Sequence, residues 1–220
     1  MDNKINLIID FDSTFIKLET IEVLADFALK NKKDKKNILD LIKKMTNKAM
    51  QGEIPFSDAL YERINLINLK SRHIDLTINY LMNHITTSFI KSKKFFELNH
   101  KNCFIISGGF KEIIIPIVKN FNIPSNQVYA NSFIYENNKL SLDKNNPLSK
   151  NNGKNIIAKN IPGYNIVIGD GFTDYEVKKN GNAKKFIQFT ENIDRKKLNA
   201  KADLICTDFK CVIDFINNDI

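Results

Sequence analysis

Five short apolar runs, each followed by a polar or glycine-containing turn, constrain the fold of this chain more than any other feature of its sequence. The runs are β-branched and nearly continuous, which is typical of strands that are buried on both faces of a parallel sheet. They therefore predict a mostly parallel sheet as the core. In chain order they are INLIID (5–10), CFIIS (103–107), NIVIGD (165–170), KKFIQF (184–189) and ADLICT (202–207).

Segments with helical spacing separate the predicted strands. GFKEIIIPIVKNF (109–121) and GKNIIAKNI (153–161) place apolar residues at helical intervals, and Pro116 is expected to kink the first of them. This alternation predicts a doubly wound α/β domain. Residues 128–142 differ, because the pair 137–138, Asn-Asn, separates two β-like runs and predicts a hairpin.

Residues 16–84 interrupt the alternation. They contain four successive amphipathic segments and no obvious strand, which predicts a helical insertion after the first strand rather than a separate N-terminal domain. We therefore expect a discontinuous α/β core of residues 1–15 and 85–220, with residues 16–84 forming an inserted helical cap domain. The four segments are ETIEVLADFALK, KNILDLIKKMTNKAM, FSDALYERINLI and IDLTINYLMNHI.

The length and composition of the chain restrict its class. Its 220 residues, with 43% hydrophobic content, are enough for one sizeable core. The N-terminal apolar stretch is broken by Asp10 and Asp12 and does not resemble a signal peptide, and no run approaches the roughly 18 apolar residues that a membrane span requires. Cys103, Cys206 and Cys211 fit no zinc spacing, so we expect reduced packing residues of a cytoplasmic protein.

The net charge of +8 raises the question of a nucleic-acid partner. Lysine, asparagine and isoleucine are abundant along the whole chain, so the charge reflects a general compositional bias. The densest basic cluster, LKNKKDKKN (29–37), contains no aromatic residue and no arginine. We interpret it as a solvated helix end or loop, and we do not expect a nucleic-acid partner.

Glycine is scarce, and five of the eight glycines lie at or just beyond predicted strand ends. The carboxyl ends of strands in an open parallel sheet share one edge, and ligands bind along that edge. The motifs DFDST (10–14), SGG (107–109) and GDGFTD (169–174) are therefore expected to converge, although they lie far apart in the sequence.

The converging motifs carry four carboxylates. Asp10 and Asp12 are two residues apart in an extended segment, so both can face the same crevice, and Asp170 and Asp174 join them from another strand end. Carboxylates gathered in this way repel one another unless a cation lies between them. A shell made only of oxygen ligands suits Mg²⁺, although Mn²⁺ remains open.

Groups that can bind an anion accompany the carboxylates. Ser107 and the amides of Gly108 and Gly109 can donate hydrogen bonds to anionic oxygens where a helix begins. Lys154 adds a positive charge, and Lys150 is the alternative because the register of this asparagine-rich loop is uncertain. A carboxylate nucleophile, a divalent cation and an anion-binding turn together indicate phosphoryl transfer.

These elements resemble the four motifs of the haloacid-dehalogenase-like phosphohydrolases. Within that superfamily the chain is similar to the phosphoserine phosphatases over nearly its whole length. MTNKAMQGEIPFSDALYERINLI (45–67) resembles the cap segment of that family, and ISGGFKEIIIPIVKNFNIPSNQVYAN (106–131) resembles its second-motif region. The resemblance implies a Rossmann-like core with an inserted helical cap, and an Mg²⁺-dependent hydrolase of phosphomonoesters.

The resemblance also implies a role for each motif residue. Asp10 would be the nucleophile that forms an aspartyl-phosphate, and Asp12 would protonate the leaving oxygen and then activate water. The metal would be held by the Asp10 carboxylate, the Asp12 main-chain carbonyl and Asp170, with Asp174 supporting its waters. The phosphoryl oxygens would be bound by Ser107, Gly108 and Lys154.

Four further positions match the substrate pocket of the family. Glu19 would bind the ammonium group of phosphoserine, and Arg63 would bind its carboxylate through two parallel hydrogen bonds. Met50 and Phe56 would exclude water. The residues alone leave other interpretations open, since Glu19 is also suited to a first helical turn, Arg63 to pairing with an acidic neighbour on its helix, and the apolar pair to a cap core.

The sequence therefore predicts hydrolysis of L-phosphoserine, the last step of serine biosynthesis, by a cytoplasmic monomer or homodimer. A related phosphatase or phosphotransferase with another substrate is the alternative, because Gln51 and Glu53 make the cap turn more polar than the family pattern and because an alcohol can also accept the phosphoryl group. An inactive nucleic-acid-binding protein is a third hypothesis, and the intact set of acidic residues argues against it.

Overall fold

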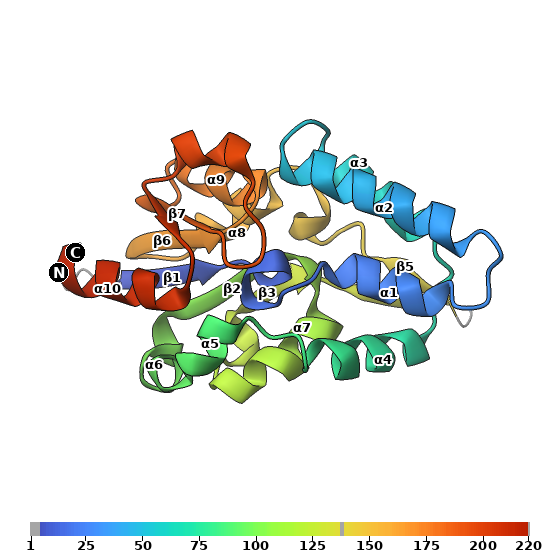
Figure 1. The fold of residues 1–220 in the computed structure, drawn as a ribbon, viewed down its shortest axis with the longest axis horizontal. Helices are drawn as coiled ribbons and strands as arrows, with labels where there is room; N and C mark the ends of the chain where they lie inside the picture. Colours follow the sequence, from blue (N-terminus) through green and yellow to red (C-terminus); the bar gives the residue numbers. More distant parts are fainter. Residues whose placement is uncertain (1–4, 137–138, 220) are drawn as a thin grey trace.

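Six parallel strands form the centre of the structure, a computed structural model that describes residues 5–136 and 139–219 (Figure 1). Their order is β3-β2-β1-β6-β7-β8, so the first strand lies in the middle of the sheet. The parallel sheet that the sequence predicts is therefore present. Its strands are β1 (Ile5–Ile9), β2 (Cys103–Phe110), β3 (Val128–Asn131), β6 (Tyr164–Gly169), β7 (Lys185–Phe189) and β8 (Leu204–Cys206).

Side chains of the central strands alternate between two apolar layers. Leu7 and Ile9 belong to the larger layer, whereas Ile8 between them belongs to the smaller one. Both layers are covered by helices, which explains why the strands read as continuous apolar runs. On the smaller layer lie α8 (Gly153–Ala158) and α9 (Phe172–Lys179) (Figure 1). The larger layer is covered by α5 (Thr87–Lys91), α6 (Lys93–Asn99), α7 (Lys111–Val118) and α10 (Phe209–Asp219).

Four helices follow β1 before the chain rejoins the core at Ile85, as the amphipathic segments predict. They lie at the end of the molecule opposite α10 (Figure 1). The chain leaves and rejoins the core through two adjacent linkers, because Ile16 and Ile85 form an antiparallel bridge and the Lys17 N–H donates to the His84 carbonyl at 2.9 Å. The helices are α1 (Thr20–Ala28), α2 (Lys35–Met50), α3 (Phe56–Asn65) and α4 (Ser71–Leu81).

The region 128–142 differs from the single hairpin that the sequence predicts. Its first residues form β3, in which Val128 pairs with Ile105 of β2 and extends the main sheet. The hairpin consists of β4 (Phe133–Glu136) and β5 (Lys139–Leu142), which pair antiparallel. The predicted turn residues 137–138 lie outside the described residues. A local pattern does not contain the partner strand, so it could not assign the first run to the sheet.

Several helices lie where the sequence analysis assigned none, namely α5, α6, α9 and α10. Helix α7 accommodates Pro116 and ends two residues later at Val118. In the described part of the chain, no helix combines the length and the apolar character needed to cross a membrane.

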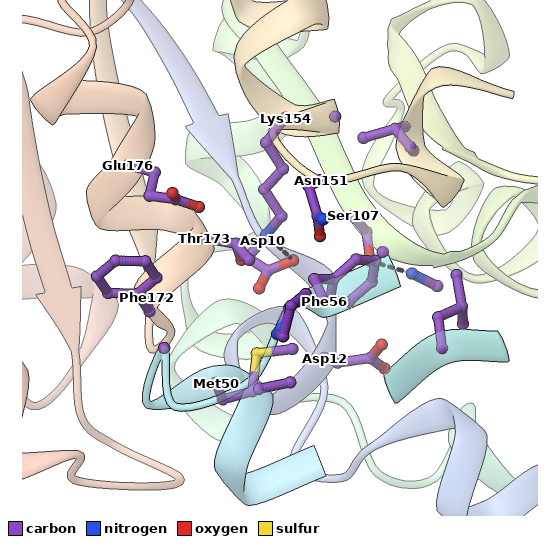
Figure 2. Close-up of a pocket in the computed structure, with 18 of the residues that line it drawn as sticks. Asp10, Asp12, Met50, Phe56, Ser107, Asn151, Lys154, Phe172, Thr173 and Glu176 are labelled. Atoms are coloured by element: carbon purple, nitrogen blue, oxygen red, sulfur yellow. Dashed lines mark hydrogen bonds and ion pairs between the residues drawn. The ribbon is translucent and has the colours of Figure 1, made fainter. Parts of the chain in front are cut away.

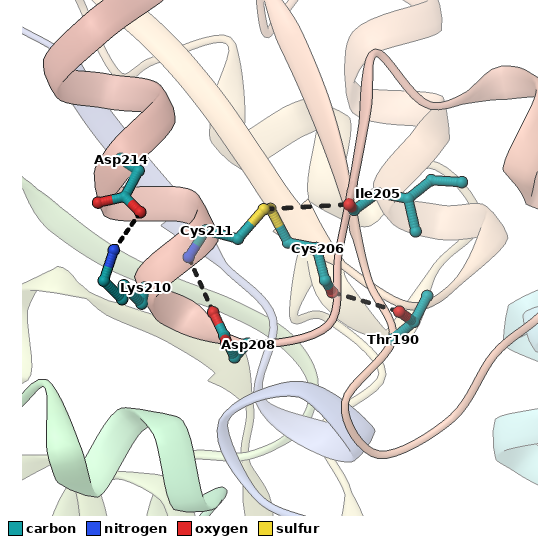
Figure 3. Close-up of a disulfide and its surroundings, with 7 residues drawn as sticks. All are labelled: Thr190, Ile205, Cys206, Asp208, Lys210, Cys211 and Asp214. Carbon is teal, nitrogen blue, oxygen red and sulfur yellow. Dashed lines mark hydrogen bonds and ion pairs between the residues drawn. A yellow bond between two sulfur atoms is a disulfide. The ribbon is translucent and has the colours of Figure 1, made fainter.

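The prediction of three reduced cysteines is wrong for two of them. Cys206, at the end of β8, and Cys211, in the first turn of α10, form a disulfide with their Cα atoms 5.6 Å apart (Figure 3). The turn between them is held by Asp208, whose carboxylate accepts the Cys211 N–H at 2.8 Å. Cys103 is free, and burial raises its pKa to about 12. Pairing depends on the distance that a strand-to-helix turn sets, which cysteine spacing does not reveal.

Candidate active site

The three predicted motifs meet at the carboxyl edge of the sheet. Asp10 follows β1 directly, Ser107 lies in β2 and Asp170 follows β6. Since β1 pairs with both β2 and β6, the three positions are neighbours in space. The Asp10 N–H donates to the Ile168 carbonyl at 2.9 Å, which ties the first motif to the adjacent strand.

Asp10, Asp170 and Asp174 form a buried acidic triad, each contributing a carboxylate oxygen within 4.8 Å of the others. Burial raises the pKa of Asp170 to about 7, with Arg195 opposing the rise and other carboxylates adding to it. Burial and the nearby Asp10 raise the pKa of Asp174 well above its usual range. Crowded carboxylates resist joint ionisation, and a hard divalent cation relieves that repulsion. The donor set therefore fits a divalent metal ion.

Lys154 reaches from α8 into this acidic triad (Figure 2). Its Nζ lies 2.8 Å from Asp10 Oδ1 and 2.7 Å from Asp174 Oδ1. Burial disfavours the ammonium form, but the two carboxylates outweigh it and hold the pKa of Lys154 above its ordinary value. Lys150, the alternative that the sequence left open, is exposed at the rim of the pocket, so Lys154 is the lysine that contacts the first motif.

Close packing requires glycine at two positions of the site. A Cβ at Gly169 would collide with the Asp174 carboxylate, which occupies the space beside the end of β6. A Cβ at Gly108 would collide with the ring of Phe56, which belongs to the insertion. The glycines therefore let a carboxylate of the acidic triad and a side chain of the insertion approach the main chain of the sheet.

An irregular helical turn after β1 carries Asp12. In this turn Ser13 adopts a left-handed conformation, with φ of +53°. Asp12 Oδ1 accepts the Thr20 N–H at 2.8 Å and also the Thr20 hydroxyl. Burial, followed by the charge of Glu19, raises the pKa of Asp12 well above its usual range. The carboxyl group can therefore hold a proton at a pH where an exposed aspartate would not.

A cavity of about 370 Å³ lies beside these groups, between the sheet edge and the insertion. Met50 and Phe56 approach Asp10 from the insertion side (Figure 2). The structure brings together all the residues that the sequence singled out, since Asp174 belongs to the acidic triad and the others line the cavity. Those lining residues are Asp10, Asp12, Glu19, Met50, Phe56, Arg63, Ser107, Gly108, Lys154 and Asp170.

Glu19 is positioned by two polar partners. Its Oε1 accepts the Ser13 hydroxyl at 2.7 Å and lies 3.5 Å from a terminal nitrogen of Arg195. Burial raises the pKa of Glu19, and Arg195 opposes that rise. Although Glu19 precedes α1, its side chain makes no capping hydrogen bond to that helix.

Arg63 is a buried residue of α3 and not a helix-surface partner of an acidic neighbour. Its side chain is only 3% exposed. Nε donates to the Ala59 carbonyl at 2.9 Å and Nη1 donates to the Thr46 hydroxyl at 2.8 Å. Burial lowers the pKa of Arg63, although the charges of Glu19 and Asp12 oppose that effect.

Arg195 is a residue of the site that the sequence analysis missed. Its Nε donates to Asp170 Oδ2 at 2.6 Å, and Nη1 donates to the Asn47 side chain of α2 at 3.3 Å. The rarity of arginine could have indicated Arg195. Only three of the 33 basic residues are arginines, and a guanidinium group is well suited to pair with a buried carboxylate. The arginines are Arg63, Arg72 and Arg195.

Comparisons with known proteins find relatives over nearly the whole chain. A phosphoserine phosphatase from Bos taurus is 30% identical over 207 residues, which cover 91% of this chain and 88% of that protein. The crystal structure of a phosphoserine phosphohydrolase-like protein from Francisella tularensis has a TM-score of 0.86 and 30% identity, covering 96% of this chain and 99% of that one.

A phospho-aspartyl intermediate analogue of phosphoserine phosphatase has the same fold. Its TM-score is 0.78 at 24% identity, over 98% of this chain and 99% of that chain. No family model matches the sequence.

Proposed function

This chain belongs to the phosphoserine phosphatase family of haloacid-dehalogenase-like hydrolases, and we propose that it hydrolyses L-phosphoserine to L-serine and inorganic phosphate. One observation carries the proposal. Three buried carboxylates and a buried lysine meet at one sheet edge, beside a cavity that Glu19 and Arg63 also line. That combination suits an ester that bears a phosphate, an ammonium group and a carboxylate.

The acidic triad suits a divalent metal ion, and we assign Mg²⁺ to it because all the available ligands are hard oxygens. Asp10, Asp170 and the main-chain carbonyl of Asp12 would hold the ion, and Asp174 would support its waters. When bound, the ion would neutralise the crowded carboxylates and withdraw charge from the phosphoryl oxygens.

Asp10 is the proposed nucleophile. One carboxylate oxygen attacks phosphorus, and the bond between phosphorus and the serine oxygen breaks as the new bond forms. The Phe11 N–H at 2.7 Å and Lys154 at 2.8 Å both bind Asp10 Oδ1 and orient the carboxylate. Asp12 gives its proton to the departing serine oxygen, a role that its raised pKa supports.

The second step releases phosphate. Water attacks phosphorus of the aspartyl-phosphate, Asp12 takes the proton from that water, and the bond between phosphorus and the Asp10 oxygen breaks. Ser107, Gly108 and Lys154 bind the phosphoryl oxygens in both steps. Since Ser107 Oγ accepts the Gly109 N–H at 2.9 Å, its own proton remains available for a phosphoryl oxygen.

Selectivity comes from the insertion in this proposal. Residues 16–84 form a cap domain, Glu19 binds the substrate ammonium and Arg63 binds the substrate carboxylate. Met50 and Phe56 exclude water when the cap lies over the sheet edge. The paired linkers at Ile16 and Ile85 support this division of the chain, because the insertion crosses to and from the core at one place.

A substrate panel tests the proposed function. Release of inorganic phosphate is measured from L-phosphoserine, phosphothreonine, phosphoethanolamine and a chromogenic aryl phosphate, with Mg²⁺ or with EDTA. We expect kcat/KM for L-phosphoserine to exceed those for phosphoethanolamine and the aryl phosphate by about tenfold or more, because these two esters lack one or both of the groups that Glu19 and Arg63 would bind. Phosphothreonine carries both groups, so it tests whether the pocket accepts an added methyl group. Equal or better use of another ester would contradict the assignment, and added alcohols would reveal a phosphotransferase.

The proposed reaction is the last step of serine biosynthesis, and we assign the protein to the cytoplasm on that basis. Fractionation of cells that express the tagged chain would test the location. Whether the enzyme is a monomer or a homodimer stays a prediction that light scattering would decide.

A further inference from the structure

The segment 190–195 follows β7 and belongs to none of the motifs, yet it contacts the linkers and the acidic triad. Arg195 at its end pairs with Asp170. Glu191 near its start accepts the Ser88 N–H at 3.2 Å and the Ser88 hydroxyl, at the beginning of α5. Asn192 lies between these two residues. We call residues 13–18 the outgoing linker and residues 84–88 the returning linker.

Asn192 joins the two linkers through one amide group. Its Nδ2 lies 2.7 Å from the Thr86 hydroxyl oxygen on the returning linker and 3.1 Å from the Ser13 carbonyl on the outgoing linker. The carbonyls of Thr14 and Ile16 lie slightly further away, at 3.3 Å and 3.4 Å. An amide nitrogen carries two hydrogens, so the two shortest contacts, one on each linker, can form together.

Thr86 of the returning linker extends this hydrogen-bond network to the outgoing linker. The Thr86 hydroxyl accepts from Asn192 and donates to the Thr14 carbonyl at 2.6 Å. The Thr86 N–H also donates to the Phe15 carbonyl at 3.0 Å. The carbonyls of Ser13, Thr14 and Phe15 therefore accept hydrogen bonds from Asn192 and Thr86, and the loss of either residue leaves carbonyls of the outgoing linker without these donors.

The outgoing linker in turn places a pocket residue. The carbonyl of Ser13 is held by Asn192, while the hydroxyl of the same residue holds Glu19 at 2.7 Å. Beyond Glu19 the chain continues into the helices that carry Met50, Phe56 and Arg63. A shift of the linkers would therefore move the pocket wall relative to Asp10, while the groups on the sheet edge keep their places.

We propose that Asn192 is a positioning residue that fastens both linkers to the end of β7 and so sets where Glu19 and the rest of the insertion lie over Asp10. The inference rests on the proposed function, because it assigns substrate selectivity to the insertion wall. It differs from a packing role in one respect: it requires the hydrogen-bond donors of the amide and not only its volume.

The kinetic test uses Asn192→Ala, Asn192→Asp and the surface control Asn160→Ala, each as the full-length chain with Mg²⁺. Asn160 is exposed just beyond the end of α8, and its side chain donates to the Ile156 carbonyl of that helix at 3.1 Å. We expect Asn192→Ala to lower kcat/KM for L-phosphoserine about tenfold, and that for phenyl phosphate less than about threefold. Phenyl phosphate has neither ammonium nor carboxylate, so it does not depend on the insertion wall for those groups.

The aspartate variant separates positioning from packing. Asn192→Asp keeps the size of the side chain but sets a carboxylate against the linker carbonyls, so we expect a larger loss than with Asn192→Ala. A side chain needed only for its volume would give the opposite order. That opposite order, or equal losses on both substrates, would overturn the proposal.

Hydrogen exchange tests the same inference without any activity. The amides of Lys17 and Thr86 bridge the two linkers, and we expect both to exchange about tenfold faster in Asn192→Ala than in Asn160→Ala. Unchanged exchange would overturn the inference even if the chain hydrolyses phosphoserine, and faster exchange would support it even if the proposed substrate is wrong. If the Asn192 variants do not fold, Thr86→Val removes the other partner of the 2.7 Å contact and is measured in the same way.

Discussion

The two walls of the pocket are held together in different ways. On the sheet edge, buried charges neutralise one another, because Lys154 bridges two carboxylates and Arg195 pairs with a third. On the insertion wall, Arg63 is held by Ala59 of its own helix and by Thr46 of the neighbouring helix. Met50 and Phe56 contribute apolar surface that lies against the core glycines Gly171 and Gly108.

This difference suggests that the two walls of the pocket have different functions. Removing Lys154 or Arg195 from the sheet edge leaves buried carboxylates uncompensated, so that wall tolerates little loss of positive charge. Removing Met50 or Phe56 from the insertion wall leaves mainly apolar contacts to adjust. We therefore assign the chemistry to the sheet edge and the choice of substrate to the insertion, and the following predictions test that division from the largest expected effect to the smallest.

Asp10→Asn should give the largest loss of activity. The amide cannot serve as the nucleophile, so we expect kcat for L-phosphoserine to fall about 10⁴-fold or more. The thermal midpoint should not fall, because the change removes one of three crowded carboxylates. Asp26→Asn, which alters a surface pair with Lys35, is the matched control for the loss of an aspartate. Appreciable Mg²⁺-dependent turnover in the Asp10 variant would refute the nucleophilic role.

Lys154→Met should damage both stability and activity. It leaves the carboxylates of Asp10 and Asp174 without their shared cation, and we expect unfolding in urea without metal to become easier by about 3–5 kcal/mol. With Mg²⁺, kcat/KM should fall about 10³-fold, because the charge that we propose binds the phosphoryl oxygens is lost. Lys150→Met, a change at the pocket rim, should alter kcat/KM less than about twofold. Comparable losses from the two substitutions would show that the sheet edge does not depend on one lysine.

Arg63→Ala should act on one class of substrate. We expect kcat/KM for L-phosphoserine to fall about 30-fold, and that for phosphoethanolamine, which lacks the carboxylate, to change little. Thr46→Val removes one hydrogen bond that positions the guanidinium, and it should give a smaller loss with the same selectivity. Equal losses on both substrates would mean that Arg63 stabilises the insertion and does not bind the substrate carboxylate.

The stability of the sheet edge should depend on pH and on metal. The pKa of Asp170 is raised to about 7, so the metal-free folded chain holds a proton that the unfolded chain has already lost above about pH 4. Its stability should therefore fall as the pH rises from about 4 to about 7. Mg²⁺ at about 100 times its Kd should raise the thermal midpoint by about 5–10 °C at pH 8, and by less at pH 5 where protons compete. Calorimetry with Mg²⁺ and with EDTA measures both effects, and equal shifts at the two pH values would contradict them.

Much of the fold follows from local patterns. Apolar runs ending in DFDST, SGG and GDGFTD predict adjacent strand ends, and the pairing of β1 with β2 and β6 provides them. Val128 shows the limit of prediction from local patterns. Its apolar run suits a hairpin strand and a strand of the main sheet equally well, and only its pairing with Ile105 assigns it to the sheet. Strand character is encoded within a few residues, but the identity of the neighbouring strand is not.

The partners of the site residues were harder to foresee. Arg195 lies 176 positions from Glu19 and belongs to no motif, yet its guanidinium lies against two acidic residues of the site. Asn192 gives no signal in a chain rich in asparagine. The choice between Lys150 and Lys154 stayed open because they lie four positions apart where an asparagine-rich loop enters α8, and the backbone there decides which side chain is buried.

The sequence by itself determined the class of fold and which residue types stand at the strand ends, because burial period and turn composition are properties of short segments. Only the tertiary structure decided which charges neutralise one another, which loop fastens the insertion and which cysteines pair. Coulomb and hydrogen-bond energies depend on distances of a few ångströms between groups far apart in the chain, and those distances exist only once the strands have assembled.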